Sequence, residues 1–155
     1  MELGLKGKVA VVMASSRGLG KAIAMEFAKE GAIVIISSRS EIALEQAAAE
    51  IKNAAKDAEV YYQRCDMTNE EDILSLFEFV SGKFGRIDIL INNTGGPKTG
   101  GFLEVDDGDW YAAFEQNLLS YIRTSRAVLP YMKKQQSGRI VNISSSSTKE
   151  VIDRQ

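Results

Sequence analysis

The sequence predicts an α/β fold built on a doubly wound parallel sheet. Five segments that suit strands alternate with helical patterns along the chain, and such alternation is typical of parallel sheets with right-handed crossovers. Each of these segments is followed by glycine or polar residues. Because the carboxyl ends of parallel strands meet at one edge of a sheet, we expect these strand ends to form one ligand site.

Bulk composition indicates one globular domain over residues 1–155, with 45% hydrophobic and 26% charged residues. The net charge of −2 offers no basic surface for nucleic acid. No apolar run approaches the length that crosses a bilayer, and the N-terminal MELGLKGK lacks the apolar core of a signal peptide. One cysteine is consistent with a reducing compartment, so we expect a cytoplasmic protein without a membrane partner.

The chain contains no histidine. This excludes His-based nucleophilic triads and argues against a transition-metal site. Any acid–base chemistry must therefore use Tyr, Lys, Ser, Asp or Glu. Nothing in the sequence marks Cys65 as activated, so we expect it to be a buried thiol.

The first strand is predicted over about Lys8–Met13 and the helix after it over about Gly18–Lys29, with Gly31 at its end. The turn between them is small and glycine-rich, so its backbone can approach a ligand closely. Unsatisfied N–H groups at the start of the helix favour an anion, which predicts a phosphate site. An ordinary tight strand–helix connection is the alternative. The candidate residues of the turn are Ala14, Ser15, Ser16, Arg17, Gly18, Leu19 and Gly20.

The next two strands are predicted over Ala32–Ser37 and about Glu59–Arg64, and an alanine-rich helix over about Glu41–Lys56 lies between them. Thr68 and Glu71 have the spacing of a capping box. This spacing predicts that Thr68 begins the third helix.

The last elements are a strand over Ile87–Ile91, a glycine-rich loop, a long helix over about Asp109–Lys134 and a strand over Arg139–Ile143. Pro130 predicts a kink or a break near residue 129. The apolar stripe of the long helix consists of Phe114, Leu118, Tyr121, Ile122, Val128, Leu129 and Met132.

Ser38 and Arg39 follow the second strand, where an acidic residue would bind a ribose 2′-hydroxyl. A guanidinium matches a 2′-phosphate by bidentate hydrogen bonding, whereas a carboxylate would repel it. Arg17 lies in the glycine turn and could reach the same phosphate. The end of this strand therefore favours NADP(H), with solvated surface arginines as the alternative.

With these residues, the chain resembles the short-chain dehydrogenase/reductase family, in the style of the 3-oxoacyl-carrier-protein reductase type. The turn ASSRGLG resembles the family's TGxxxGxG, and Asn92-Asn93-Thr94-Gly95 resembles its NNAG. Arg139–Ser145 resembles the strand that delivers the catalytic serine, and Asn117 lies where the family keeps a catalytic asparagine. The resemblance covers essentially the whole chain.

The resemblance implies a Rossmann-type sheet in the order 3-2-1-4-5 and hydride transfer between NADP(H) and a small carbonyl or alcohol substrate, with a 3-oxoacyl thioester as one candidate. Ser145 would polarise the substrate carbonyl, and Asn117 would hold a water in a proton relay. Further cofactor contacts are implied for Asp66, Met67, Asn93, Thr94 and Gly95. Family members commonly assemble as dimers and tetramers, which we carry over as an expectation.

These assignments have structural alternatives. Asp66 could be a turn or cap residue, and Asn92–Gly96 a structural turn. Asn117 could face solvent, and Ser145 could belong to a serine loop, Ser144–Ser147. The stretch Ser146–Glu150 is not the small-residue run that the resemblance leads us to expect.

The chain departs from the family pattern at three points. Met13 and Ala14 replace Thr and Gly, and Ala14 can still form a tight turn if its φ stays negative. Thr94 replaces Ala. The family's Tyr-x-x-x-Lys pair and last strands would follow Gln155, where the printed sequence ends.

Three hypotheses follow from these departures. The first is a truncated part of an NADP(H)-dependent oxidoreductase. The second is a nucleotide-binding module without catalysis. The third is an inactive fragment whose long helix, including Phe114 and Tyr121, lacks cover and promotes self-association or aggregation.

Overall fold

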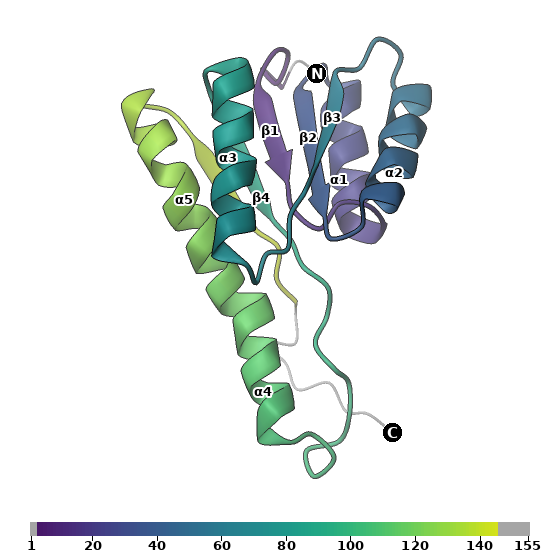
Figure 1. Ribbon diagram of the computed structural model, residues 1–155. Coiled ribbons are helices and arrows are strands. Elements are labelled where there is room, and N and C mark those ends of the chain that lie inside the picture. The colour runs from purple at the N-terminus through teal and green to yellow at the C-terminus, as the bar shows by residue number, and fades with distance from the viewer. Residues whose placement is uncertain (1–2, 146–155) are drawn as a thin grey trace.

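The computed structural model describes residues 3–145 and contains five strands flanked by helices (Figure 1). The strands are β1 (Val9–Val12), β2 (Ile33–Ser38), β3 (Val60–Arg64), β4 (Ile89–Asn92) and β5 (Arg139–Asn142). The helices are α1 (Gly18–Lys29), α2 (Glu41–Ala54), α3 (Glu70–Phe84), α4 (Asp107–Phe114), a π-helical turn η1 (Glu115–Leu119) and α5 (Ser120–Lys134). All pairings are parallel and the sheet order is β3-β2-β1-β4-β5, which confirms the predicted topology.

The central strand β1 is buried along its whole length. Successive side chains of a strand point to opposite faces of the sheet. Ala10 and Val12 accordingly pack in a cluster with α1 and α2, whereas Val9 and Val11 pack in a second cluster with α3 and α5. Covering both faces in this way explains why β1 is apolar at every position rather than at alternate ones.

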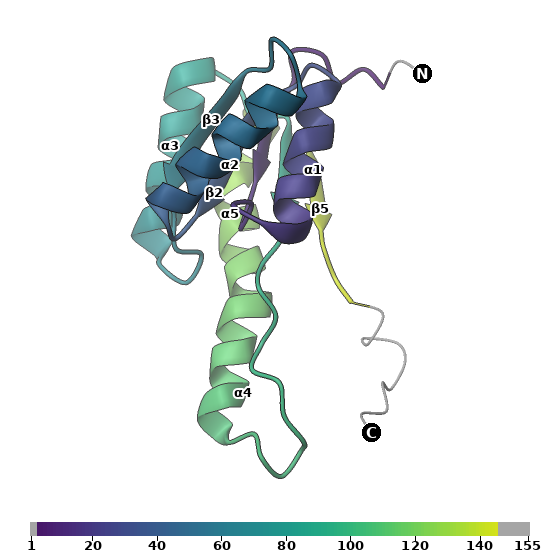
Figure 2. The same cartoon turned by 90° about the vertical axis from the view of Figure 1, so that its right-hand side faces the viewer.

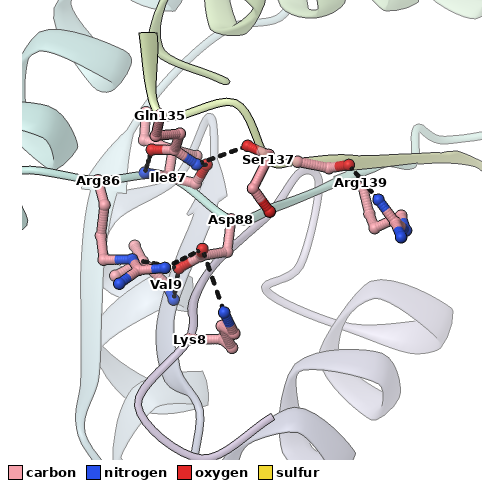
Figure 3. Close-up of polar contacts among 9 residues, drawn as sticks. Lys8, Val9, Arg86, Ile87, Asp88, Gln135, Ser137 and Arg139 are labelled. Atoms are coloured by element: carbon pink, nitrogen blue, oxygen red, sulfur yellow. Dashed lines mark hydrogen bonds and ion pairs between the residues drawn. The ribbon is translucent and has the colours of Figure 1, made fainter. Parts of the chain in front are cut away.

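The amino-terminal edge of the sheet is held by the buried carboxylate of Asp88 (Figure 3). It accepts hydrogen bonds from the Val9 N–H at 2.9 Å and from Arg86 at 2.8 and 2.6 Å, and Lys8 lies 3.8 Å away. Burial opposes ionisation, but these partners outweigh it and hold the pKa of Asp88 below its ordinary value. Next to it, the Gln135 amide bonds both the N–H and the carbonyl of Ile87. This cluster ties the starts of β1 and β4 to the end of α5.

The predicted capping box at Thr68 is wrong. Helix α3 is capped by Asn69, whose side chain accepts a hydrogen bond from the Asp72 N–H at 3.1 Å. The Thr68 hydroxyl instead donates to Asp66 at 2.8 Å. Asparagine is at least as good an N-cap as threonine, and the nearby carboxylate engages the threonine hydroxyl.

Of the kink or break predicted near residue 129, the break is wrong. Helix α5 continues through Pro130 to Lys134. Buried Val128 and Met132 lie on either side of the proline and pack on the core of the sheet, which keeps this segment helical. The irregular turn lies earlier, at η1, and the helix begins two residues before the predicted start, behind an Asp106–Asp109 capping box.

Helix α4 extends beyond the sheet, together with the loop that leads into it (Figures 1 and 2). Within residues 3–145, the structure has no helix with the length and apolarity required to cross a membrane.

Candidate functional site

A cavity of about 600 Å³ lies at the carboxyl ends of β1 to β4. It is bounded by the glycine turn, the ends of β2 and β3, the segment after β4 and the turn η1. Its lining residues are Ala14, Ser16, Arg17, Gly18, Leu19, Ser38, Arg39, Ser40, Ala43, Cys65, Asp66, Met67, Thr68, Asn93, Thr94, Gly95 and Gln116. Twelve of the fourteen cofactor contacts expected from the sequence are therefore brought together here.

The other two expected residues, Ser15 and Gly20, are buried within the turn. The Ser15 hydroxyl donates to the Val12 carbonyl at 2.6 Å and accepts from the Ser37 N–H at 2.9 Å, so it joins β1 to β2. A Cβ on Gly20 would lie 2.5 Å from the Ala14 carbonyl oxygen. Glycine at this position therefore lets α1 pack directly against the turn.

Ala14 adopts a φ of +46°, so the negative φ on which an unstrained turn at this alanine depends is not kept. The tight reversal after β1 requires the left-handed region, which costs an L-residue with a Cβ about 1 kcal/mol. Further along the turn, Gly18 has a φ of +57° and open space where a Cβ would be. Arg17 is the N-cap of α1 and makes no side-chain cap hydrogen bond, so the first backbone N–H groups of the helix receive no acceptor from the cap side chain.

Asp66 lies on the cavity wall at the end of β3. Burial opposes ionisation, but hydrogen bonds from the Thr68 N–H and hydroxyl, at 3.0 and 2.8 Å, outweigh it. Together with the nearby charges of Arg39 and Arg64, they lower the pKa of Asp66. The carboxylate is therefore an anionic acceptor at neutral pH.

Cys65 is buried beside Asp66. Burial, reinforced by the charge of Asp72, raises the pKa of the Cys65 thiol to about 12. The thiol stays protonated at neutral pH, which confirms the expectation of a buried, unactivated cysteine.

The two asparagines at the end of β4 connect neighbouring strands. The Asn93 amide donates to the carbonyls of Met13 and Ala14 at 3.3 and 3.2 Å. The Asn92 amide donates to Asn142 at 2.8 Å, and its oxygen accepts from Thr124 at 2.7 Å. The two asparagines of Asn92–Gly96 thus have a structural role. Thr94 and Gly95, in the same segment, also line the cavity.

Gln116 lines the cavity and was not a sequence candidate. Its amide donates to the Gly95 carbonyl at 2.7 Å. The sequence offers only one signal, a polar residue next to Asn117. The direction of the Gln116 side chain depends on the π turn η1, and the spacing of apolar residues does not predict that turn.

The expected catalytic residues lie outside the lining of this cavity. Asn117 is half-buried in η1, and its amide donates to the Ala113 carbonyl at 3.0 Å. Ser145 is exposed in the segment after β5. The Tyr121 hydroxyl donates to the Ile143 carbonyl at 3.0 Å, so it joins the helix just after Asn117 to the chain just before Ser145. Ser146 to Glu150 lie outside the described residues.

Comparison with known proteins places this geometry in context. A family model described as short chain dehydrogenase matches residues 8–154. The uncharacterized oxidoreductase YvaG of Bacillus subtilis is 36% identical over 147 residues, a match that covers 95% of this chain and 54% of the relative. The 3-oxoacyl-acyl-carrier-protein reductase FabG of Haemophilus influenzae is 36% identical over 141 residues, which cover 91% and 56%. The chain thus spans about half the length of these curated relatives.

Two crystal structures are similar over nearly the whole chain. Actinorhodin polyketide ketoreductase with NADPH has a TM-score of 0.88 and 32% identity, covering 94% of this chain and 56% of that protein. L-Sorbose reductase from Gluconobacter frateurii, complexed with NADPH and L-sorbose, has a TM-score of 0.89 and 33% identity, covering 96% and 56%.

Proposed function

The chain belongs to the short chain dehydrogenase family, and from this premise we propose that it binds NADP(H) at the carboxyl edge of its sheet. It forms the cofactor-binding part of an oxidoreductase that transfers hydride between NADP(H) and a small carbonyl or alcohol substrate. The observation that carries this proposal is the cavity, which joins the glycine turn, two arginines, Asp66 and the segment after β4. The similar structures with NADPH support the same cofactor.

The glycine turn fits a pyrophosphate. The N-terminus of α1 presents backbone N–H groups and the positive end of the helix dipole. Open space at Gly18 leaves room for an oxygen to approach the backbone, and Gly20 keeps the helix close to the turn. Both features suit an anionic ligand that lies against the backbone.

The end of β2 fits a 2′-phosphate. Arg17 and Arg39 line the cavity, and both side chains are exposed to an incoming ligand. Ser38 adds a hydroxyl in the same wall. Two guanidinium groups attract a phosphate dianion, whereas the NAD pattern places a carboxylate at this strand end.

The end of β3 fits the adenine. The ionised Asp66 can accept a hydrogen bond from the exocyclic amino group, and Met67 supplies an apolar surface next to it. At the other end of the cavity, Asn93, Thr94 and Gly95 offer backbone groups to the rest of the cofactor.

The catalytic part of the proposal concerns Ser145 and Asn117. NADPH supplies the hydride when bound. The Ser145 hydroxyl donates to the substrate carbonyl oxygen, and Asn117 holds a water for proton transfer. None of the five tyrosines has a lysine four residues later, so the family's proton donor is not assigned to a residue of this sequence. A 3-oxoacyl thioester, a cytoplasmic location and a homo-oligomer remain proposals.

Calorimetric titration of the purified chain with NADPH and NADH tests the cofactor proposal. We expect NADPH to bind more tightly, by roughly tenfold or more, because each charge-assisted hydrogen bond contributes about 1.5–3 kcal/mol. Arg39→Asp should remove this preference, and Lys56→Asp, which changes an exposed basic residue in the segment between α2 and β3, outside the lining of the cavity, is the control. A cooperatively unfolding chain that binds neither nucleotide would overturn the proposal.

Turnover separates the oxidoreductase from the alternative, a nucleotide-binding module without catalysis. NADPH oxidation is followed with a panel of small ketones and 3-oxoacyl thioesters. Carbonyl-dependent oxidation that is lost in Ser145→Ala supports the enzyme, whereas tight NADPH binding without turnover supports the module. Sedimentation of the same sample reports the oligomeric state.

A further inference from the structure

The π turn η1 interrupts the long helix where the helix passes the cavity. Turns of this kind are frequent at functional sites. Here the turn is held by several contacts: Asn117 donates to the Ala113 carbonyl, Ser120 donates to the Gln116 carbonyl, and Arg123 pairs with Glu115. Among the residues of this turn, Gln116 lines the cavity.

The Gln116 side chain holds the segment that follows β4. Its amide nitrogen lies 2.7 Å from the Gly95 carbonyl oxygen and 3.5 Å from that of Gly96. Gly95 and Gly96 are exposed and lie in no helix or strand. A Cβ on Gly95 would lie 3.3 Å from the Gln116 amide nitrogen, so glycine leaves space for this contact. The cavity wall at Gly95 is thus oriented by a side chain from a distant part of the sequence.

The sheet order decides which half of a ligand this contact affects. Strands β2 and β3 lie on one side of β1, and β4 lies on the other. Ser38, Arg39 and Asp66 therefore form the end of the cavity suited to the 2′-phosphate and adenine. Gly95 and Gln116 lie toward the opposite end, which is left for the nicotinamide half.

We propose that Gln116 is a positioning residue for the nicotinamide half of NADP(H), acting through the Gly95 carbonyl. The amide orients this peptide, and with it the backbone groups that face the cofactor. This inference rests on the proposed function. According to this inference, Gln116 affects binding at the end of the cavity near β4 and does not affect binding at the adenosine end.

The test compares two ligands on the Gln116→Met variant. Methionine keeps the length and helix propensity of glutamine but cannot donate a hydrogen bond. We expect the dissociation constant of NADPH to rise about fivefold, the effect of one ordinary hydrogen bond. Binding of adenosine 2′,5′-bisphosphate, which lacks the nicotinamide half, should stay unchanged. Gln46→Met, at an exposed position of α2, is the matched control and should alter neither constant.

Each outcome decides a different question. Equal NADPH affinity in wild type and Gln116→Met overturns the role of Gln116 but leaves the proposed function intact. A parallel loss for both ligands also overturns it, because a general structural effect would weaken both halves. If wild type binds neither ligand, the proposed function fails, and this inference fails with it. Gln116→Ala repeats the comparison with a smaller side chain, and thermal unfolding confirms that each variant is folded.

Discussion

Every residue of β1 is buried, whereas β5, two strands away in the same sheet, has exposed side chains at three of its four positions. Both strands have parallel partners, but β1 is apolar at every position and has helices on both faces, whereas β5 is apolar only at Ile140 and Val141, and Val141 is 45% exposed. The comparison teaches that an apolar side chain in a strand is not necessarily buried. Burial depends on which elements pack against the strand.

The long helix shows the same contrast along its own length. In α5, Val128 and Met132 are buried against the core of the sheet. In contrast, Phe114, Leu118, Ile122 and Leu129 remain exposed, although they belong to the same predicted stripe. Several of these residues border an apolar groove beside Tyr121 and Asn142. The exposed part of the stripe agrees with the expectation that this helix lacks cover.

The largest effect on stability is expected from Leu90→Ala in β4. Leu90 is fully buried in the cluster that packs against α3 and α5, so the substitution leaves a cavity and should lower the free energy of unfolding by about 3 kcal/mol. The matched substitution Leu118→Ala, on the exposed part of the long helix, should change it by less than about 0.5 kcal/mol. Urea denaturation measures both. Equal losses would show that the long helix face is buried in solution.

An intermediate effect is expected from Asp88→Asn, which tests whether the stability of the central strands depends on the ion pairs of Asp88. The substitution should cost about 2 kcal/mol at pH 7, because the Arg86 guanidinium loses its charged partner. The folded-state pKa of Asp88 is lowered, so its contribution is present above the unfolded value of about 3.9 and is lost as the pH falls below it.

The difference between wild type and Asp88→Asn should therefore shrink as the pH falls below about 4. Denaturation curves at several pH values measure it, and Asp57→Asn, at an exposed loop position, is the control. A difference that stays constant over this range would contradict an ionic role for Asp88.

The smallest effect is expected from Ala14→Gly. Because Ala14 has a φ of +46°, glycine should relieve strain and raise the free energy of unfolding by about 0.5–1 kcal/mol. The same substitution at Ala49, exposed in the middle of α2, should instead lower it by about 1 kcal/mol. Opposite signs in chemical denaturation confirm the strained turn, and a loss at both positions would contradict it.

The residues at the strand ends show which part of the site local sequence patterns predict. Ala14, Arg39, Asp66 and Asn93 each follow a different strand, and parallel topology alone predicts that they meet. The structure brings them to one cavity. Gln116 could not be predicted in the same way, because its contact with Gly95 depends on a π turn and on how the long helix crosses the segment after β4.

The sequence by itself determined the α/β class and the edge where the site forms, while the strand order was implied by the family resemblance. The class and the edge depend on short-range periodicity and on the chirality of βαβ units, which are local properties of the chain. Only the tertiary structure decided that Ala14 adopts a positive φ, that Asn69 rather than Thr68 caps α3, and that part of the long helix stays exposed. Backbone strain, competition between hydrogen-bonding groups and burial all depend on neighbours that are distant in sequence, so no local pattern specifies them.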